Sequence, residues 1–166
     1  LIADLSFADL VLWVPESVDG DESFRIIAHC RPTTGATVFH RDQVGERAEP
    51  GVHDLLSRAY AQNRIVASHE DECDLAEVEA VPVRRDGRTI ALMTRHTQGV
   101  RRGGVSRLER NYRLCGSTLM AMVAEGSFPG TEAPSAARRG EPRVGDGLAV
   151  LAREGRVRYV SPSGIS

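Results

Sequence analysis

The strongest local structure signal in the sequence is VEAVPVRRDGRTIALMTRH, residues 78–96. Two apolar runs flank Asp86-Gly87, a pair that tolerates positive φ at both central positions of a tight turn. The stretch therefore predicts an antiparallel hairpin that bends at this pair.

A two-residue turn also predicts the register of the two strands. It sets Val83 opposite Ile90, Val81 opposite Leu92, and Ala80 opposite Met93. The residues expected on one face are Val81, Val83, Ile90 and Leu92, and those expected on the other are Ala80, Pro82, Ala91 and Met93. Because both faces are apolar, we expect the hairpin in the middle of a sheet, with cover on each side. Pro82 argues against a central strand, since proline cannot donate a ladder hydrogen bond.

The composition is that of an ordinary globular chain. Its 166 residues, 41 % hydrophobic and 27 % charged, exceed one typical small domain and fall short of two, so we expect a complete domain with part of another attached. A net charge of -2 gives no general attraction to nucleic acid or anionic membrane. The longest apolar run, residues 10–15, is far below the ~20 residues that cross a bilayer. We expect a cytoplasmic piece of a longer protein, with no direct nucleic-acid or membrane contact.

The first half of the chain reads as strands around one helix. Strands are expected at residues 8–15, 23–31 and 65–67, after a last helical turn at 1–6, and residues 33–49 form a loop with a short strand around Val38. In the second strand one face carries Phe24, Ile26, Ala28 and Cys30. A helix is expected from Pro50 to Asn63, with an apolar stripe of Val52, Leu55, Leu56, Ala59 and Tyr60.

A second helix is predicted after Ser106, which forms a capping box with Glu109. Gly126 and Pro129 end it. Its apolar residues repeat like a coiled-coil seam: Leu108, Tyr112, Cys115, Leu119 and Met122. This seam is our candidate dimer or signalling helix, although it could also pack within one chain. Arginines at 107, 110 and 113 lie where the helix dipole disfavours cations, so we expect them to pair with carboxylates.

The C-terminal part predicts a change of domain. Residues 127–142 are rich in Pro, Gly, Ser and Ala, which is typical of a linker. Residues 146–161 predict two short strands around Glu154-Gly155 and resemble the opening of a PAS domain, with Ser161-Pro162 where that family more often has Asn-Pro. The predicted organisation is a sensor domain at 1–126, a linker at 127–142 and an incomplete PAS-like domain at 143–166.

The hairpin pattern, Val-Pro-Val, a charged turn ending in Gly, then Ile-Ala-Leu, resembles that of GAF domains, which are small-molecule sensor and dimerisation modules. That resemblance implies an α+β fold, a central antiparallel sheet with helices packed on one face and a ligand pocket on the other. Residues 33–49 correspond to a region that often closes over the ligand. Most of the chain resembles the N-terminal half of actinobacterial cytosolic sensor histidine kinases of the PdtaS type, through LIADLSFADLVLWVP, AHCRPTTG, AVPVRRDGRTIALMTRH, LERNYRLCGSTLMAMVAEGSFPG and RVGDG.

In that family a GAF domain is followed by a PAS domain, a phosphoacceptor histidine helix and an ATP-binding domain. The kinase phosphorylates a response regulator that binds RNA and acts by antitermination. The resemblance implies that this chain is the signal-sensing and dimerisation region of such a homodimeric kinase. It would be non-catalytic by itself, with ATP bound only in the kinase region that lies outside it.

Two groups of side chains are candidates for sensing chemistry. Cys30 lies between His29 and Arg31, and nearby positive charge lowers a thiol pKa and favours oxidation or metal binding; alternatively it is a small buried hydrophobe. His69 and Cys73 lie among acidic residues that could ligate a metal ion, although a solvated acidic loop is the simpler interpretation. Arg95 and His96 follow the second hairpin strand and could reach a pocket, whereas His40 and His53 receive no role.

The signal itself stays open between a nucleotide, a redox-active small molecule and a metal. One alternative is a GAF-type free methionine sulfoxide reductase, which needs a low-pKa thiol beside a resolving thiol. The cysteines at 30, 73 and 115 have no such close spacing. The other alternative is a ligand-free module that serves only for dimerisation.

Overall fold

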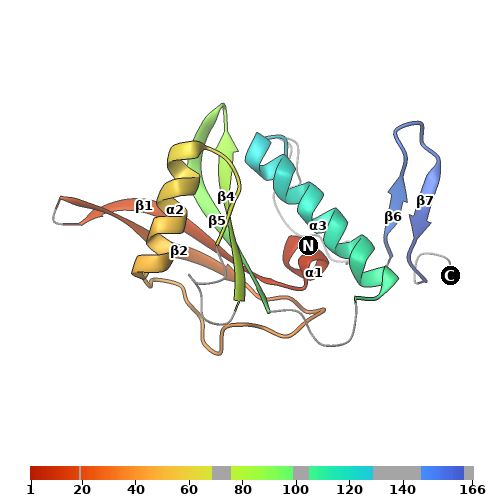
Figure 1. The fold of residues 1–166 in the computed structure, drawn as a ribbon, viewed down its shortest axis with the longest axis horizontal. Helices are drawn as coiled ribbons and strands as arrows, with labels where there is room; N and C mark the ends of the chain where they lie inside the picture. Colours follow the sequence, from red (N-terminus) through yellow and green to blue (C-terminus); the bar gives the residue numbers. More distant parts are fainter. Residues whose placement is uncertain (19, 69–75, 99–104, 129–146, 163–166) are drawn as a thin grey trace, which may run out of the picture.

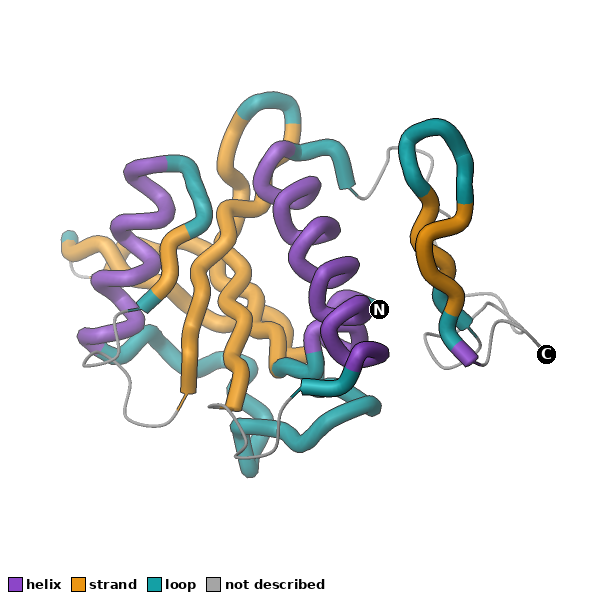
Figure 2. The backbone as a smooth tube through the Cα atoms, turned by 45° about the vertical axis from the view of Figure 1, so that its right-hand side comes forward, coloured by secondary structure: helices purple, strands orange, loops and turns teal. Residues whose placement is uncertain are grey.

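The computed structural model describes residues 1–18, 20–68, 76–98, 105–128 and 147–162. It is an α+β fold around a five-stranded antiparallel sheet with strand order β2-β1-β5-β4-β3. The elements are α1 (Ile2–Ser6), β1 (Asp9–Val18), β2 (Asp21–Cys30), α2 (Pro50–Gln62), β3 (Val66–Ala67), β4 (Ala76–Arg85), β5 (Arg88–Gln98), α3 (Arg107–Glu125), β6 (Ala149–Leu151) and β7 (Val157–Val160). Helix α2 covers one face of the sheet, and α1 with α3 covers the other (Figure 1, Figure 2).

The predicted hairpin is confirmed as β4 and β5, with positive φ at Asp86 (50°) and Gly87 (77°). Its predicted register is wrong by one residue. A bulge at Ile90 separates the pair Arg84–Thr89 from the pair Val83–Ala91, so Val81 lies opposite Met93 and Ala80 opposite Thr94. Because side chains alternate between the two faces of a strand, one extra residue moves the side chains beyond the bulge to the opposite face from the one expected.

The bulge therefore decides which side chains meet each helix. Leu92 joins Val78 and Ala80 in the core under α2, and Met93 joins Val81 and Val83 in the core under α1 and α3. The expected grouping of Val81 with Leu92 is wrong for this reason, while the expectation that both faces are covered is confirmed. Ile90 itself is 51 % exposed.

Pro82 fits because the neighbouring strand stops before reaching it. Strand β3 pairs only with Glu79 and Ala80 of β4. Among the described residues, β4 from Pro82 onward is hydrogen-bonded to β5 alone. Proline is tolerated on such an edge segment since no ladder partner requires its missing donor.

A second bulge corrects the prediction for β2. The register between β1 and β2 shifts so that Ile27 has no partner between Trp13–Ile26 and Leu12–Ala28. Phe24 and Ile26 face the α2 core as expected. Beyond the bulge the alternation reverses, so the sequence-based placement of Ala28 and Cys30 on that face is wrong; both are exposed.

Segment 31–49 contains no strand around Val38, which corrects a further expectation. The backbone N–H of Val38 instead donates to the carboxylate of Asp9. Only Arg47 forms an isolated bridge, with Arg25 of β2. Helix α2 begins at Pro50 and ends at Asn63 in the left-handed conformation, as predicted. Its stripe is buried at Leu55, Leu56 and Ala59, whereas Tyr60 is exposed.

Helix α3 has the predicted caps. The hydroxyl of Ser106 accepts from the Glu109 N–H, and Gly126 adopts positive φ after the last turn. Among the arginines at its start, Arg113 pairs with Glu109 at 2.8 Å, as expected of that stripe. The Glu109 side chain thus faces Arg113 along the helix.

The seam of α3 packs largely within the chain. Tyr112, Cys115 and Leu119 pack with Leu5 and Phe7 around α1. The next buried residues are Met120 and Val123, which contact Val81 of the sheet. The predicted seam residue Leu108 is 37 % exposed.

Gly116 allows the backbones of α1 and α3 to approach closely. A Cβ there would lie 2.5 Å from Ser6 Oγ and 3.3 Å from the Ser6 nitrogen. The Ser6 hydroxyl is buried, with no hydrogen-bond partner among the described residues. The Ser6 side chain therefore fills the space above this glycine without forming a bond.

Replacing Gly116 by alanine is expected to lower the free energy of unfolding by about 1 to 3 kcal/mol, because overpacking outweighs the gain in helix propensity. Ser6→Ala should be neutral or stabilising, since it removes an unpaired buried hydroxyl. Urea unfolding of both single variants and the double variant measures the coupling. We expect Ser6→Ala to rescue most of the loss, and additive effects would contradict the contact.

The predicted C-terminal strands are confirmed as the β6–β7 hairpin, which forms a separate two-stranded sheet. Leu148, just before it, packs against the cluster around Tyr112. Within the described part of the chain, no helix is both long and apolar enough for a bilayer crossing.

Candidate functional site

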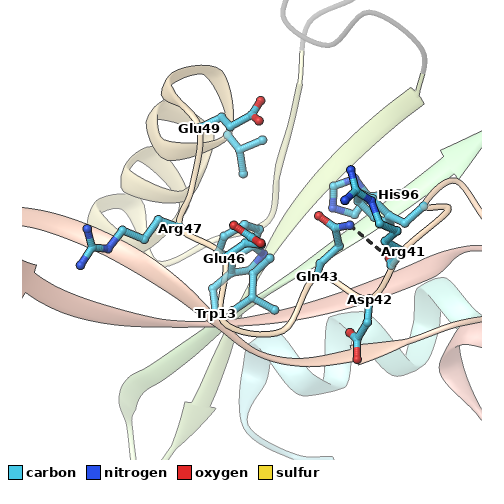
Figure 3. A pocket seen from close by; sticks show the side chains of 11 residues that line it. Trp13, Arg41, Asp42, Gln43, Glu46, Arg47, Glu49 and His96 are labelled. Carbon is cyan, nitrogen blue, oxygen red and sulfur yellow. Dashed lines mark hydrogen bonds between the residues drawn. The ribbon is translucent and has the colours of Figure 1, made fainter.

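An open cavity of about 420 Å³ lies on the α2 side of the sheet (Figure 3). Its floor comes from the strands and one wall from α2, while much of the rest comes from residues 39–49, the segment that we call the roof. This arrangement agrees with the expectation that 33–49 closes over a ligand site. The lining residues are Trp13, Ile26, Phe39, Arg41, Asp42, Gln43, Glu46, Arg47, Glu49, Val52 and His96.

Asp9, a fully buried carboxylate at the start of β1, holds the chain that leads into the roof. It accepts from the Thr37 hydroxyl at 2.7 Å and from the Val38 N–H at 2.5 Å. It also accepts from His29 Nε2 at 3.1 Å, and the His29 side chain is only 1 % exposed. A buried carboxylate is tolerated where donors satisfy its oxygens, so Asp9 fixes the entry to the roof.

A second carboxylate ties the same segment to α1. Asp4 accepts from the N–H and the hydroxyl of Thr33, each at 2.7 Å, and its carbonyl accepts from Thr34. Partial burial works to raise the pKa of Asp4, but the bonds from Thr33 outweigh it and hold that pKa below its usual value. Residues 33–38 are thus tied to both α1 and β1.

Two side chains that line the cavity, Trp13 and His96, are joined by buried Thr94 in a hydrogen-bonded row. The Trp13 indole N–H donates to Thr94 Oγ1 at 2.8 Å, and Thr94 Oγ1 lies 2.8 Å from His96 Nε2. All three are buried. Phe39 of the roof packs its ring against the rings of His96 and His29, with centroids 4.7 and 5.2 Å away.

The pKa of His96 is lowered to about 4, mainly by burial; the Asp9 carboxylate acts to raise it, and nearby His29 adds to the lowering. The imidazole is therefore neutral near pH 7. A neutral buried ring can both donate and accept hydrogen bonds at the cavity wall.

The predicted sensing residues separate in the structure. The bulge at Ile27 directs His29 toward the cavity side, beside Asp9, and leaves Cys30 and Arg31 exposed. The interpretation of Cys30 as a buried hydrophobe is therefore wrong, and its redox role stays a prediction. Cys115 packs on α3 near α1. The candidate metal ligands His69 and Cys73 lie outside the described residues.

Sequence reasoning named Arg95 and His96 as able to reach a pocket. The structure places His96 there, whereas the Arg95 side chain bonds Glu79 of β4 and Ser117 of α3 and does not line the cavity. Sequence reasoning missed Asp9, Thr94 and Trp13. One signal was present for Asp9, because a single carboxylate beside the apolar strand LVLWVP is unusual unless it is bonded. Thr94 carried no such signal, since alternating threonines are common in strands.

The five-stranded antiparallel sheet, with α1 and α3 on one face and α2 and the cavity on the other, defines a GAF-type sensor domain. A family model described as the GAF domain of histidine kinase PdtaS matches residues 1–116. The chain belongs to this family.

Two curated relatives and one solved structure agree with this assignment. The sensor histidine kinases PdtaS of Mycobacterium tuberculosis (strain CDC 1551 / Oshkosh) and Mycolicibacterium smegmatis (strain ATCC 700084 / mc(2)155) are 38 % and 36 % identical to this chain. Each alignment covers 100 % of this chain and 34 % of the relative, so the chain spans about a third of their length. A solved sensor region of a sensor histidine kinase is 38 % identical, with a TM-score of 0.78 over 99 % of this chain and 55 % of that one.

Proposed function

We propose that this chain is the signal-sensing and dimerisation region of a two-component sensor histidine kinase, and that the cavity is its input site. The observation that carries the proposal is the cavity itself, which lies between the sheet and the roof. Family membership supports the parent kinase. The fragment is the sensory part of that kinase, and the phosphoacceptor and ATP-binding regions belong to the remainder of the parent protein.

A ligand could act on the kinase through α1. The segment leading into the roof is bonded to Asp4 of α1, and α1 packs on α3 at Gly116. A roof that moves on ligand binding would shift α1 and, with it, the packing of α3. Two packing arrangements of α3 would then correspond to two levels of kinase activity.

The output that we propose for the parent protein is supported by its family membership alone. We propose that it phosphorylates a response regulator that binds RNA and acts by antitermination. We also propose a homodimer that forms through α3, whose side chains Leu108 and Leu114 are 37 % and 60 % exposed. Large exposed apolar side chains on one helix favour pairing with a partner.

The reductase alternative finds less support. Its chemistry needs a reactive thiol at the pocket, and of the described cysteines neither Cys30 nor Cys115 lines the cavity. Burial raises the pKa of the Cys115 thiol, which disfavours the thiolate. A ligand-free dimerisation module would not need the cavity.

Filling the cavity tests the proposal in the full-length kinase. Val52→Trp inserts a large ring from α2, and Gln43→Trp does so from the roof. We expect each to change the basal autophosphorylation rate by about threefold or more, because it biases the roof as a ligand would. Ala61→Trp, on an exposed position just before the end of α2, is the matched control. Thermal unfolding checks that each variant folds, and unchanged rates in both folded cavity variants would refute the input site.

A further inference from the structure

The proton positions in the row Trp13–Thr94–His96 follow from the bonding capacity of each group. An indole nitrogen only donates, so Thr94 Oγ1 must accept from Trp13. Thr94 is fully buried, and His96 Nε2 is the partner left for its own proton among the described residues. The Thr94 hydroxyl therefore donates to Nε2, and the ring proton of neutral His96 lies on Nδ1.

His96 Nδ1–H is consequently a fixed donor in the cavity wall. The side chain is 6 % exposed and lines the cavity, and its Nδ1 has no hydrogen-bond partner in the described part of the chain. The Nδ1 atom can be reached from the open cavity, so an acceptor on a ligand that enters the cavity would take this hydrogen bond from water.

The rest of the cavity favours an uncharged aromatic molecule. Trp13 and Phe39 supply ring surfaces, and Ile26 and Val52 supply apolar contacts. The lining also includes three carboxylates and two guanidiniums, so there is no surplus of positive charge for an anion. One of these, Arg47, is already bonded to Glu16 at 3.0 Å, and its side chain extends away from the cavity in Figure 3.

Resting on the proposed function of the cavity, we propose that its ligand is an uncharged aromatic or heteroaromatic molecule with a carbonyl oxygen or ring nitrogen that accepts from His96 Nδ1–H. A phosphate or carboxylate group is disfavoured because it would lose its hydration beside a neutral imidazole and the acidic side chains of the lining. A cation is disfavoured at this point because Nδ1–H presents a positive dipole end.

The proton on Nδ1 is tested directly by long-range ¹H–¹⁵N NMR of the imidazole in the intact chain at pH 7. We expect the Nδ1–H tautomer for His96. Thr94→Val removes the hydroxyl that donates to Nε2, so both neutral tautomers of His96 should be populated in this variant. An Nε2–H tautomer in the parent chain would overturn the proposal.

Three probes of similar shape test the ligand class: benzamide, benzoate and toluene. Trp13 is the single tryptophan of the chain and lines the cavity, so its fluorescence reports binding. We expect benzamide to bind with a Kd on the order of millimolar, as suits a fragment, and roughly tenfold more tightly than the other two. His96→Phe should abolish the preference for benzamide over toluene.

The outcomes separate the ligand class from the input site. Binding of benzoate at least as tight as benzamide, or an unchanged preference in His96→Phe, would overturn the ligand class and leave the cavity as input site intact. If no probe perturbs Trp13, the proposed ligand class is also rejected. The proposal that the cavity is the input site is tested separately, and it is rejected if the filled-cavity variants leave the kinase rate unchanged.

Discussion

Replacing Asp9 by alanine is expected to lower the free energy of unfolding by about 3 to 5 kcal/mol, because several hydrogen-bond donors lose their acceptor at a cost of about 1 to 3 kcal/mol each. The change would leave Thr37, the Val38 N–H and His29 without their acceptor. Asp9→Asn keeps an acceptor oxygen and should cost about 1 to 3 kcal/mol. Urea unfolding followed by Trp13 fluorescence measures both.

A matched control is Asp42→Ala, because that carboxylate also lies near His29 but is 75 % exposed. It should change the free energy of unfolding by less than about 0.5 kcal/mol. The role of Asp9 in holding the roof has its own readout, since trypsin should cleave at exposed Arg41 faster in Asp9→Asn than in the parent chain. Equal cleavage rates would assign Asp9 to general stability alone.

Acidification is expected to destabilise the domain through His96. The pKa of His96 is about 4 in the folded chain and near 6.5 in the unfolded chain, so the unfolded state takes up the proton first. The contribution of neutral His96 to the free energy of unfolding is fully present above pH 6.5, and it is lost as the pH falls from 6.5 to 4. The total loss is on the order of 3 kcal/mol.

The difference between parent and His96→Gln isolates this effect, because glutamine can accept from Thr94 and does not titrate. Unfolding free energies measured across pH 4 to 7 should fall less steeply in this variant. His40→Gln, at an exposed histidine, should leave the slope unchanged. If His96→Gln and the parent give parallel profiles, His96 is not the group responsible.

The sequence allowed prediction of most of the helices and strands, but not of which side chains point to each face of the sheet beyond the bulges. The turn at Asp86-Gly87, the caps of α3 and the start of α2 depend on local chemistry, and each lies where it was predicted. The register depends on the bulges at Ile27 and Ile90. A bulge is set by packing between strands distant in the sequence, so local alternation cannot reveal it.

Contacts between residues distant in the sequence also explain why most of the candidate site could not be predicted. His29 and Cys30 are adjacent in the sequence, and one inserted residue decides which of them meets Asp9. Trp13 and Thr94 are separated by 81 residues along the chain, so their bond was beyond local pattern reasoning. His96, near the end of a recognisable strand, could be expected near a pocket.

Pro82 has a consequence for how copies of this domain can associate. An open strand edge is a template for uncontrolled pairing with another chain, and natural sheets protect such edges with proline and charge. Beyond Ala80, the last residue of β4 that pairs with β3, the open edge of β4 carries Pro82 and then Arg84 and Arg85. Fusion of two sheets along this border is therefore discouraged, which leaves the helical side as the safer route to a controlled assembly.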